Sequence, residues 1–103
     1  MEIEFDPDKD RINQMKHGIS LAAAADIDLD AATVIEDRRI DYGEPRFLAY
    51  APIGGRLHVL CFTMRGNFRA GQSTAGEPLA VVRAIGLRKA NRREQRRYDA
   101  QTA

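Results

Sequence analysis

The amino-acid sequence predicts an α+β protein, with a small antiparallel sheet that follows two helices and precedes a third. Helix signals occur near both ends of the chain, whereas the middle is rich in β-branched and aromatic residues. Helices, a meander of strands and a terminal helix, in that order, are typical of this class. A chain of 103 residues has the usual size of one domain, so we predict a single domain over residues 1–103.

The first thirty residues contain signals for a short strand and two helices. Residues 2–6 alternate apolar and charged side chains, which predicts an edge strand. Asp6 can cap a helix over residues 7–17 that begins with proline, and Gly18 is a typical helix terminator. A second helix is expected over residues 20–27, capped by its serine and built on an alanine run.

The rest of the chain predicts the sheet and the terminal helix. Strands are expected over residues 33–36, 46–53, 56–64 and 79–87. Gly54-Gly55 predicts a two-residue hairpin between the second and third of these strands. Residues 69–78 are rich in Gly, Ser, Thr and Ala, which predicts a long loop. The sequence becomes strongly helical from Arg88 to about Asp99.

The formal net charge of +1 conceals an uneven distribution of charge. Acidic residues gather in the first half of the chain. Basic residues gather near its end: Arg83, Arg88, Lys89, Arg92, Arg93, Arg96 and Arg97. A basic segment of this kind suits phosphate binding, although a solvated helix face explains the same composition.

Composition also argues against several classes of protein. The single cysteine, Cys61, allows no intrachain disulfide, and its apolar neighbours predict a buried thiol. The first residues lack the basic and apolar regions of a signal peptide. No apolar stretch approaches the roughly 20 residues of a membrane span. We therefore expect a cytoplasmic protein that does not associate with membranes.

Four groups of residues, in order along the chain, carry a resemblance to a known family. They are Phe5-Asp6-Pro7 with Lys9, Asn13 and Lys16-His17-Gly18; Asp41-Tyr42-Gly43-Glu44 with Arg46; Thr63 with Arg65-Gly66; and the run from Arg88 to Glu94 with Tyr98. Together these groups resemble the BrnT toxins of bacterial type II toxin–antitoxin pairs. The sequence departs from the family at Gly86, where serine is usual, and in the length of the segment 69–78.

The resemblance implies a RelE-like fold and a ribonuclease that inhibits translation. It also implies a partner, an antitoxin of the BrnA type with a ribbon-helix-helix DNA-binding domain. In that family the toxin–antitoxin complex binds its own promoter, so operator DNA is an expected partner only through the complex. No metal or cofactor is expected.

Metal-independent RNA cleavage requires a base for the 2′-hydroxyl, cations for the phosphate and an acid for the leaving 5′-oxygen. Arg65 and Arg88 are candidates for the phosphate, because each is predicted at a strand end. Lys16 and His17 end the first predicted helix, and an imidazole can transfer protons near neutral pH. Glu94 is a candidate base. Further RNA-binding candidates are Lys9, Arg46, Lys89, Arg92, Arg93 and Tyr98.

Each candidate also has a structural explanation. A cation at a helix C-terminus, such as Lys16 or His17, stabilises the helix dipole without any catalysis. Glu94 could simply pair with arginines of its own helix, and Tyr98 could be a packing residue. A non-catalytic nucleic-acid-binding or regulatory protein, or a structural partner in a DNA-bound complex, therefore remains the alternative hypothesis.

A calcium site is not expected, although Asp26, Asp28 and Asp30 are spaced like the start of an EF-hand loop. That loop needs glycine at its sixth position and glutamate at its twelfth, where this chain has Ala31 and Asp37.

Overall fold

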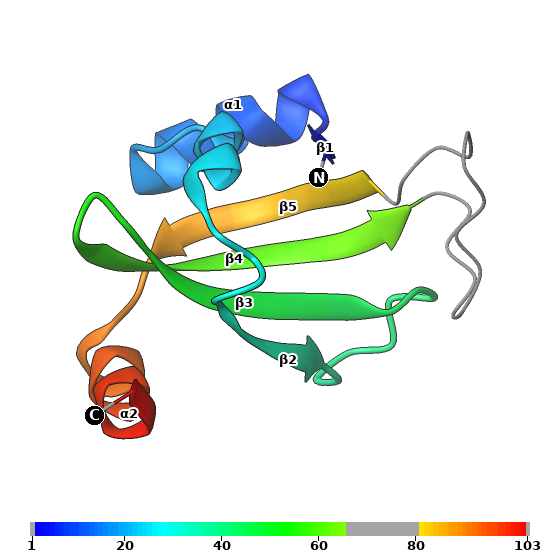
Figure 1. Cartoon of the computed structure of the whole chain (residues 1–103). Helices are drawn as coiled ribbons and strands as arrows, with labels where there is room; N and C mark the ends of the chain where they lie inside the picture. Colours follow the sequence, from blue (N-terminus) through cyan, green and yellow to red (C-terminus); the bar gives the residue numbers. More distant parts are fainter. Residues whose placement is uncertain (1, 66–80, 103) are drawn as a thin grey trace, which may run out of the picture.

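The computed structural model describes residues 2–65 and 81–102 as a five-stranded sheet with helices on either side (Figure 1). The elements along the chain are β1 (Glu2–Glu4), α1 (Pro7–His17), the 3₁₀ helix η1 (Leu21–Asp26), β2 (Thr33–Asp37), β3 (Arg46–Ile53), β4 (Arg56–Arg65), β5 (Val81–Lys89) and α2 (Arg92–Thr102). The α+β class is confirmed. The predicted loop 69–78 and the first two residues of the strand 79–87 lie outside the described residues.

The sheet is mixed, with strand order β1-β5-β4-β3-β2. β2 to β5 form the predicted antiparallel meander, but β1 pairs with β5 in parallel, so the prediction of an antiparallel sheet was wrong at this edge. The alternation of residues 2–6 identifies an edge strand but contains no information about its partner. That partner lies about 80 residues away, and an ion pair between Glu4 and Arg83, at 3.2 Å, bridges the two strands.

The signals at the ends of α1 are confirmed. The carboxylate of Asp6 accepts a hydrogen bond from the backbone N–H of Asp8 at 2.8 Å, and Gly18 ends the helix in the left-handed conformation with φ of 69°. The predicted second α-helix is instead the 3₁₀ helix η1. Its buried residues Leu21 and Ala24 are three positions apart, a spacing that aligns side chains when a helix has three residues per turn.

The hairpin and its two strands, β3 and β4, agree closely with the prediction from the sequence. Gly54 and Gly55 adopt φ of 58° and 80°, as a type I′ turn requires. The predicted helix from Arg88 was wrong at its start, because β5 continues to Lys89 and α2 begins at Arg92. Backbone pairing with β4 holds Arg88 in the sheet, opposite Val59.

The two faces of the sheet are covered to different extents. η1 packs on one face (the covered face), and α1 lies beside β5. Ten buried residues from the strands, η1 and its C-cap form the core of the covered face: Leu21, Ala24, Ile27, Ala49, Ala51, Leu60, Phe62, Val82, Ala84 and Leu87. The opposite face, which we call the uncovered face, has a smaller cluster of Leu57, Val59 and Ala90, with Tyr98 of α2 packed against it. α2 itself has no buried residue.

Candidate active site

Arginines gather on the uncovered face of the sheet. Because neighbours in a strand point to opposite faces, the buried residues of the covered face place Arg46, Arg65, Arg83 and Arg88 on the other one. Arg39, just after β2, lines the same hollow as Leu48 and Val59 of this face. A cationic surface of this kind attracts polyanions.

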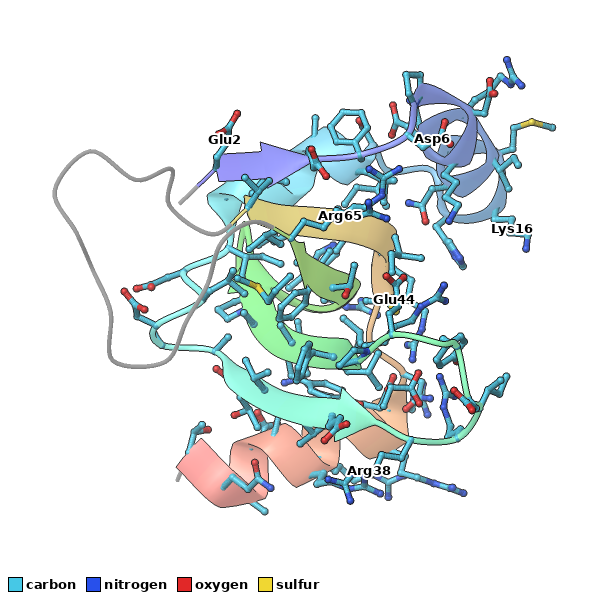
Figure 2. All side chains as sticks on the ribbon, turned by 90° about the vertical axis from the view of Figure 1, so that its right-hand side faces the viewer. Glu2, Asp6, Lys16, Arg38, Glu44 and Arg65 are labelled. Carbon is cyan, nitrogen blue, oxygen red and sulfur yellow. The ribbon has the colours of Figure 1, made fainter. Side chains whose placement is uncertain are left out.

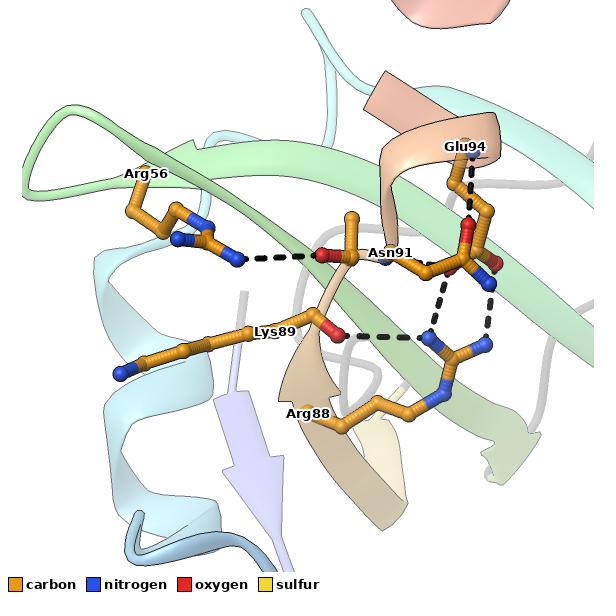
Figure 3. Close-up of polar contacts among 6 residues, drawn as sticks. Arg56, Arg88, Lys89, Asn91 and Glu94 are labelled. Atoms are coloured by element: carbon orange, nitrogen blue, oxygen red, sulfur yellow. Dashed lines mark hydrogen bonds and ion pairs between the residues drawn. The ribbon is translucent and has the colours of Figure 1, made fainter. Parts of the chain in front are cut away.

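Arg88 forms the closest ion pair of this face (Figure 3). Its two terminal nitrogens donate to the two carboxylate oxygens of Glu94 at 2.7 and 2.9 Å. Glu94 also accepts a hydrogen bond from the backbone N–H of Asn91, whose side chain accepts from the backbone N–H of Glu94. This reciprocal pair is a capping box at the start of α2. The same carboxylate therefore joins the helix to the sheet and orients Arg88.

The pair also determines the protonation of both groups. The hydrogen bond from Arg88 is the main cause that lowers the pKa of Glu94, and that from Glu94 is the main cause that raises the pKa of Arg88. Glu94 is consequently ionised at neutral pH, and the lowered pKa makes it a weaker base than an ordinary glutamate.

A hollow of about 250 Å³ lies beside Arg88. Its polar lining includes Arg88 of β5, His17 of α1, and Arg39 and Tyr42 of the connection between β2 and β3. Leu48, Val59 and Cys61 are among its apolar lining residues. We call this hollow the arginine pocket. It brings two guanidinium groups and an imidazole to one place, a combination that can bind phosphate and transfer a proton.

Asp37 holds two of these side chains in position. It is almost fully buried, and Arg39 donates to its two oxygens at 2.9 and 3.0 Å, while the hydroxyl of Tyr42 lies 3.2 Å away. The hydrogen bond from Arg39 is the main cause that lowers the pKa of Asp37 well below the usual range. Asp37 thus remains an anion that fixes the Arg39 side chain at the edge of the arginine pocket.

A second hollow continues the arginine pocket toward α1. It is lined by Lys9, Lys16 and Ile85, and it shares His17 and Gly86 with the arginine pocket. A side chain at position 86 is sterically possible, because a Cβ built on Gly86 would lie 3.9 Å from its nearest neighbour, the side-chain oxygen of Asn13. Gly86 thus lines both hollows with backbone atoms alone.

Two predicted candidates therefore lie beside Arg88, a third lies in the second hollow, and one is distant. His17 lines the arginine pocket, Lys16 lines the second hollow, and Glu94 contacts Arg88 directly. Arg65 is opposite Val81 at the far end of β4, where it lies 3.9 Å from Glu4. Figure 2 shows Lys16 and Arg65 on well-separated parts of the molecule.

The predicted RNA-binding residues lie in several places, and Lys89 points away from the face that carries Arg88 (Figure 3). Lys9 lines the second hollow, and Arg46 stacks 3.9 Å above the ring of Tyr42. Lys89, Arg92 and Arg93 are exposed where β5 leads into α2. Tyr98 packs against the small cluster of the uncovered face, as the structural explanation of this residue proposed, and its ring also borders a hollow beside α2.

The sequence did not identify Arg39 and Asp37, which had no motif of their own. The only available signal was the pattern of an acid two residues before an arginine at a strand end. Cys61 is half-buried rather than buried, and burial is the main cause that raises the pKa of its thiol. Within residues 2–65 and 81–102, no group of three His, Cys, Asp or Glu residues is arranged to hold a metal ion. None of the described helices is long and apolar enough to cross a membrane.

Fold and site together define a class of protein, a small α+β domain with an arginine-lined pocket on the uncovered face of its sheet. The family model described as "ribonuclease toxin, BrnT, of type II toxin-antitoxin system" matches residues 5–94. The chain therefore belongs to the BrnT family of ribonuclease toxins. No curated protein matches it.

Proposed function

We propose that this protein is a metal-independent endoribonuclease with a RelE-like fold, which cleaves RNA in the cytoplasm and inhibits translation until its antitoxin binds. The observation that carries the proposal is the arginine pocket, where Arg88, Arg39 and His17 converge from distant parts of the chain. These side chains match the requirements of phosphodiester cleavage by a neighbouring hydroxyl.

In the proposed reaction, the 2′-oxygen of one nucleotide attacks the adjacent phosphorus, and the bond to the 5′-oxygen breaks. The products are a 2′,3′-cyclic phosphate and a 5′-hydroxyl. Arg88 and Arg39 neutralise the charge that grows on the phosphate oxygens. His17 and Glu94 are both candidates for taking the 2′-hydroxyl proton, and Lys16 or His17 for protonating the 5′-oxygen.

Glu94 has a second role in this proposal. Its contact with Arg88 mimics the one that a phosphate makes, because both ligands offer paired oxygens to one guanidinium. RNA that reaches the arginine pocket must share or replace this carboxylate. Arg65, at the far end of the face, is proposed to bind a more distant phosphate of the same strand rather than the one that is cleaved.

The ion pair between Arg88 and Glu94 also supports the alternative function, that of a non-catalytic nucleic-acid-binding or regulatory protein. If Glu94 always occupies Arg88, the arginine pocket binds no phosphate. Purified protein and RNA in the presence of a chelator separate the two functions. We expect cleavage with 5′-hydroxyl products, and a loss of about 100-fold or more in Arg88→Ala.

Arg38→Ala is the matched control, since Arg38 is an exposed arginine whose ion pair with Glu36 lies outside the arginine pocket. This variant should cleave like the wild type. No cleavage by folded wild type would support the non-catalytic alternative, whereas equal cleavage by all three proteins would exclude Arg88 from the reaction.

We further propose that the antitoxin is of the BrnA type, with a ribbon-helix-helix domain that brings the complex to operator DNA. The exposed Arg92 and Arg93 at the start of α2, a few residues after Arg88, suit an acidic antitoxin segment. Charge reversal at Arg92 and Arg93 should weaken the complex and reduce its salt dependence. Unchanged affinity would exclude this mode of inhibition.

A further inference from the structure

A hollow of about 260 Å³ lies between α2 and the strands β2 and β3. Its apolar lining is formed by Ile35, Tyr50 and Tyr98, and Thr33, Arg97 and Gln101 add hydrogen-bonding groups. We call this hollow the aromatic cleft. Ile35 remains 46% exposed, although it is a large apolar residue in a strand. The cleft is therefore an apolar surface that α2 borders but does not fill.

The aromatic cleft is adjacent to the arginine pocket. Glu94 lines the cleft and at the same time binds Arg88 with both oxygens. On β3, Tyr50 lines the cleft and Leu48 lines the arginine pocket. These two side chains are on the same face of the strand, two residues or about 7 Å apart. A nucleotide whose phosphate lies at Arg88 can therefore place its base in the cleft.

The electrostatic environment of the cleft is consistent with this connection. Burial is the main cause that raises the pKa of Tyr50, followed by the charge of Glu94, while Arg88 and Arg97 act in the opposite direction. The charges of Glu94 and Arg88 therefore both act on the Tyr50 hydroxyl.

The chemistry of the lining is that of a base-binding site. Aromatic rings stack on nucleobases, and single-stranded RNA is recognised mainly through such stacking and through hydrogen bonds to base edges. The carboxamide of Gln101 can both donate and accept, and the Thr33 hydroxyl can do the same. Arg97 adds a positive charge that favours a polyanion over an apolar protein segment.

We propose that the aromatic cleft binds the nucleobase next to the phosphate held by Arg88, and that Tyr98 and Gln101 determine which base is preferred. This inference rests on the proposed function, because it assumes that RNA reaches the arginine pocket. It assigns α2 a role in substrate selection, in addition to its capping contact with Arg88.

Binding of uncleavable RNA tests the proposal without requiring catalysis. The probes are 2′-O-methyl tetranucleotides of the four single-base compositions, and a matched tetranucleotide that lacks its bases. Affinities are measured by fluorescence anisotropy. We expect Tyr98→Leu to weaken binding of the best base-containing probe about tenfold and to leave binding of the abasic probe unchanged. Tyr98→Phe should restore most of the affinity, since the ring remains.

Gln95→Ala is the matched control on α2, because Gln95 contacts Asp99 and is not part of the cleft lining. It should bind every probe like the wild type. Gln101→Ala provides a second test of base binding in the aromatic cleft, and this test still applies if Tyr98→Leu does not fold. It should change the order of preference among the four probes while it leaves the abasic probe unaffected.

Several results would overturn the assignment. Equal loss of affinity for base-containing and abasic probes in Tyr98→Leu would show that the residue acts only on packing. Unchanged preference in Gln101→Ala would exclude base recognition. Weaker antitoxin binding in Tyr98→Leu, with unaltered affinity for RNA probes, would make the cleft a protein-docking site. Failure of the proposed function gives a different pattern, in which the probes bind as expected but wild type does not cleave unmodified RNA.

Discussion

The two faces of the sheet differ in what holds them together. On the covered face, seven buried strand residues pack with three apolar residues of η1 and its C-cap, whereas the buried cluster of the uncovered face contains only three residues. The helices differ in the same way. α1 is attached through the buried side chain of Asn13, which donates to the carbonyl oxygens of Ile19 and Leu87 and accepts from the backbone N–H of Leu87. α2 is attached through Glu94 and Tyr98 and has no buried residue.

This difference indicates that one face mainly stabilises the fold and the other mainly carries the candidate active site. Hydrophobic burial on the covered face supplies most of the stability, which leaves the other face able to carry closely spaced charges at little cost to folding. The difference can be tested by substitutions that are matched across the sheet.

The largest expected effect is on stability, from a matched pair of leucines. Leu60 is fully buried on the covered face, and Leu48 is half-buried on the uncovered one. We expect Leu60→Ala to lower the free energy of unfolding by about 2–5 kcal/mol, and Leu48→Ala by roughly 1 kcal/mol. Urea unfolding followed by circular dichroism measures both. Equal losses would show that the two faces contribute alike.

The attachment of α1 should also matter more than that of α2. Asn13→Ala leaves the backbone N–H and carbonyl of Leu87 without their partner near the end of β5. The expected loss is about 1–3 kcal/mol. Glu94→Gln, which preserves the capping box, should cost less than about 1 kcal/mol. The same unfolding measurement compares the two variants, and a larger loss in Glu94→Gln would contradict the account.

A smaller effect, on activity, is expected at Asp37. Asp37→Asn removes the charge that orients Arg39 and the acceptor of Tyr42, so both side chains lose their fixed positions at the arginine pocket. We predict a reduction of about tenfold in the rate of RNA cleavage. Arg39→Ala should produce a similar reduction, and Asp37→Asn should have little further effect in that background. Additive effects would mean that Asp37 acts independently of Arg39.

The smallest effect is a dependence of stability on acid pH. The folded state lowers the pKa of Glu94, mainly through Arg88, and that of Asp10, mainly through the backbone N–H of Leu21. Protons therefore bind the unfolded chain more readily than the folded one. The stabilisation is complete above the unfolded pKa values of about 4 and is lost as the pH falls below them. Between pH 3 and 7, the melting temperature of Glu94→Gln should change less with pH than that of the wild type. An unchanged profile in that variant would contradict the contribution of Glu94.

Features that depend on neighbouring residues could be predicted from the sequence. The cap at Asp6, the terminator at Gly18 and the hairpin at Gly54-Gly55 each depend on a few adjacent positions, and the structure confirms all three. The parallel pairing of β1 could not be predicted, because it brings together strands about 80 residues apart.

The same distinction applies to the candidate site. Lys16, His17, Arg88 and Glu94 were found because their residue types suit phosphate chemistry. Their positions relative to one another follow from packing that no local pattern encodes. Arg39 was missed for this reason, since only the folded chain places it across the arginine pocket from Arg88. Arg65 had the same local pattern as Arg88, yet the register of β4 and β5 separates the two.

The central claim is that the arginine pocket cleaves RNA in the cell. Induced expression in bacteria of wild type, Arg88→Ala and Arg38→Ala, with growth and total RNA followed together, tests it most directly. We predict growth arrest with loss of RNA in wild type and Arg38→Ala, and normal growth with intact RNA in a folded Arg88→Ala protein. Arrest and RNA loss in all three strains, or in none of them with folded protein present, would contradict the account.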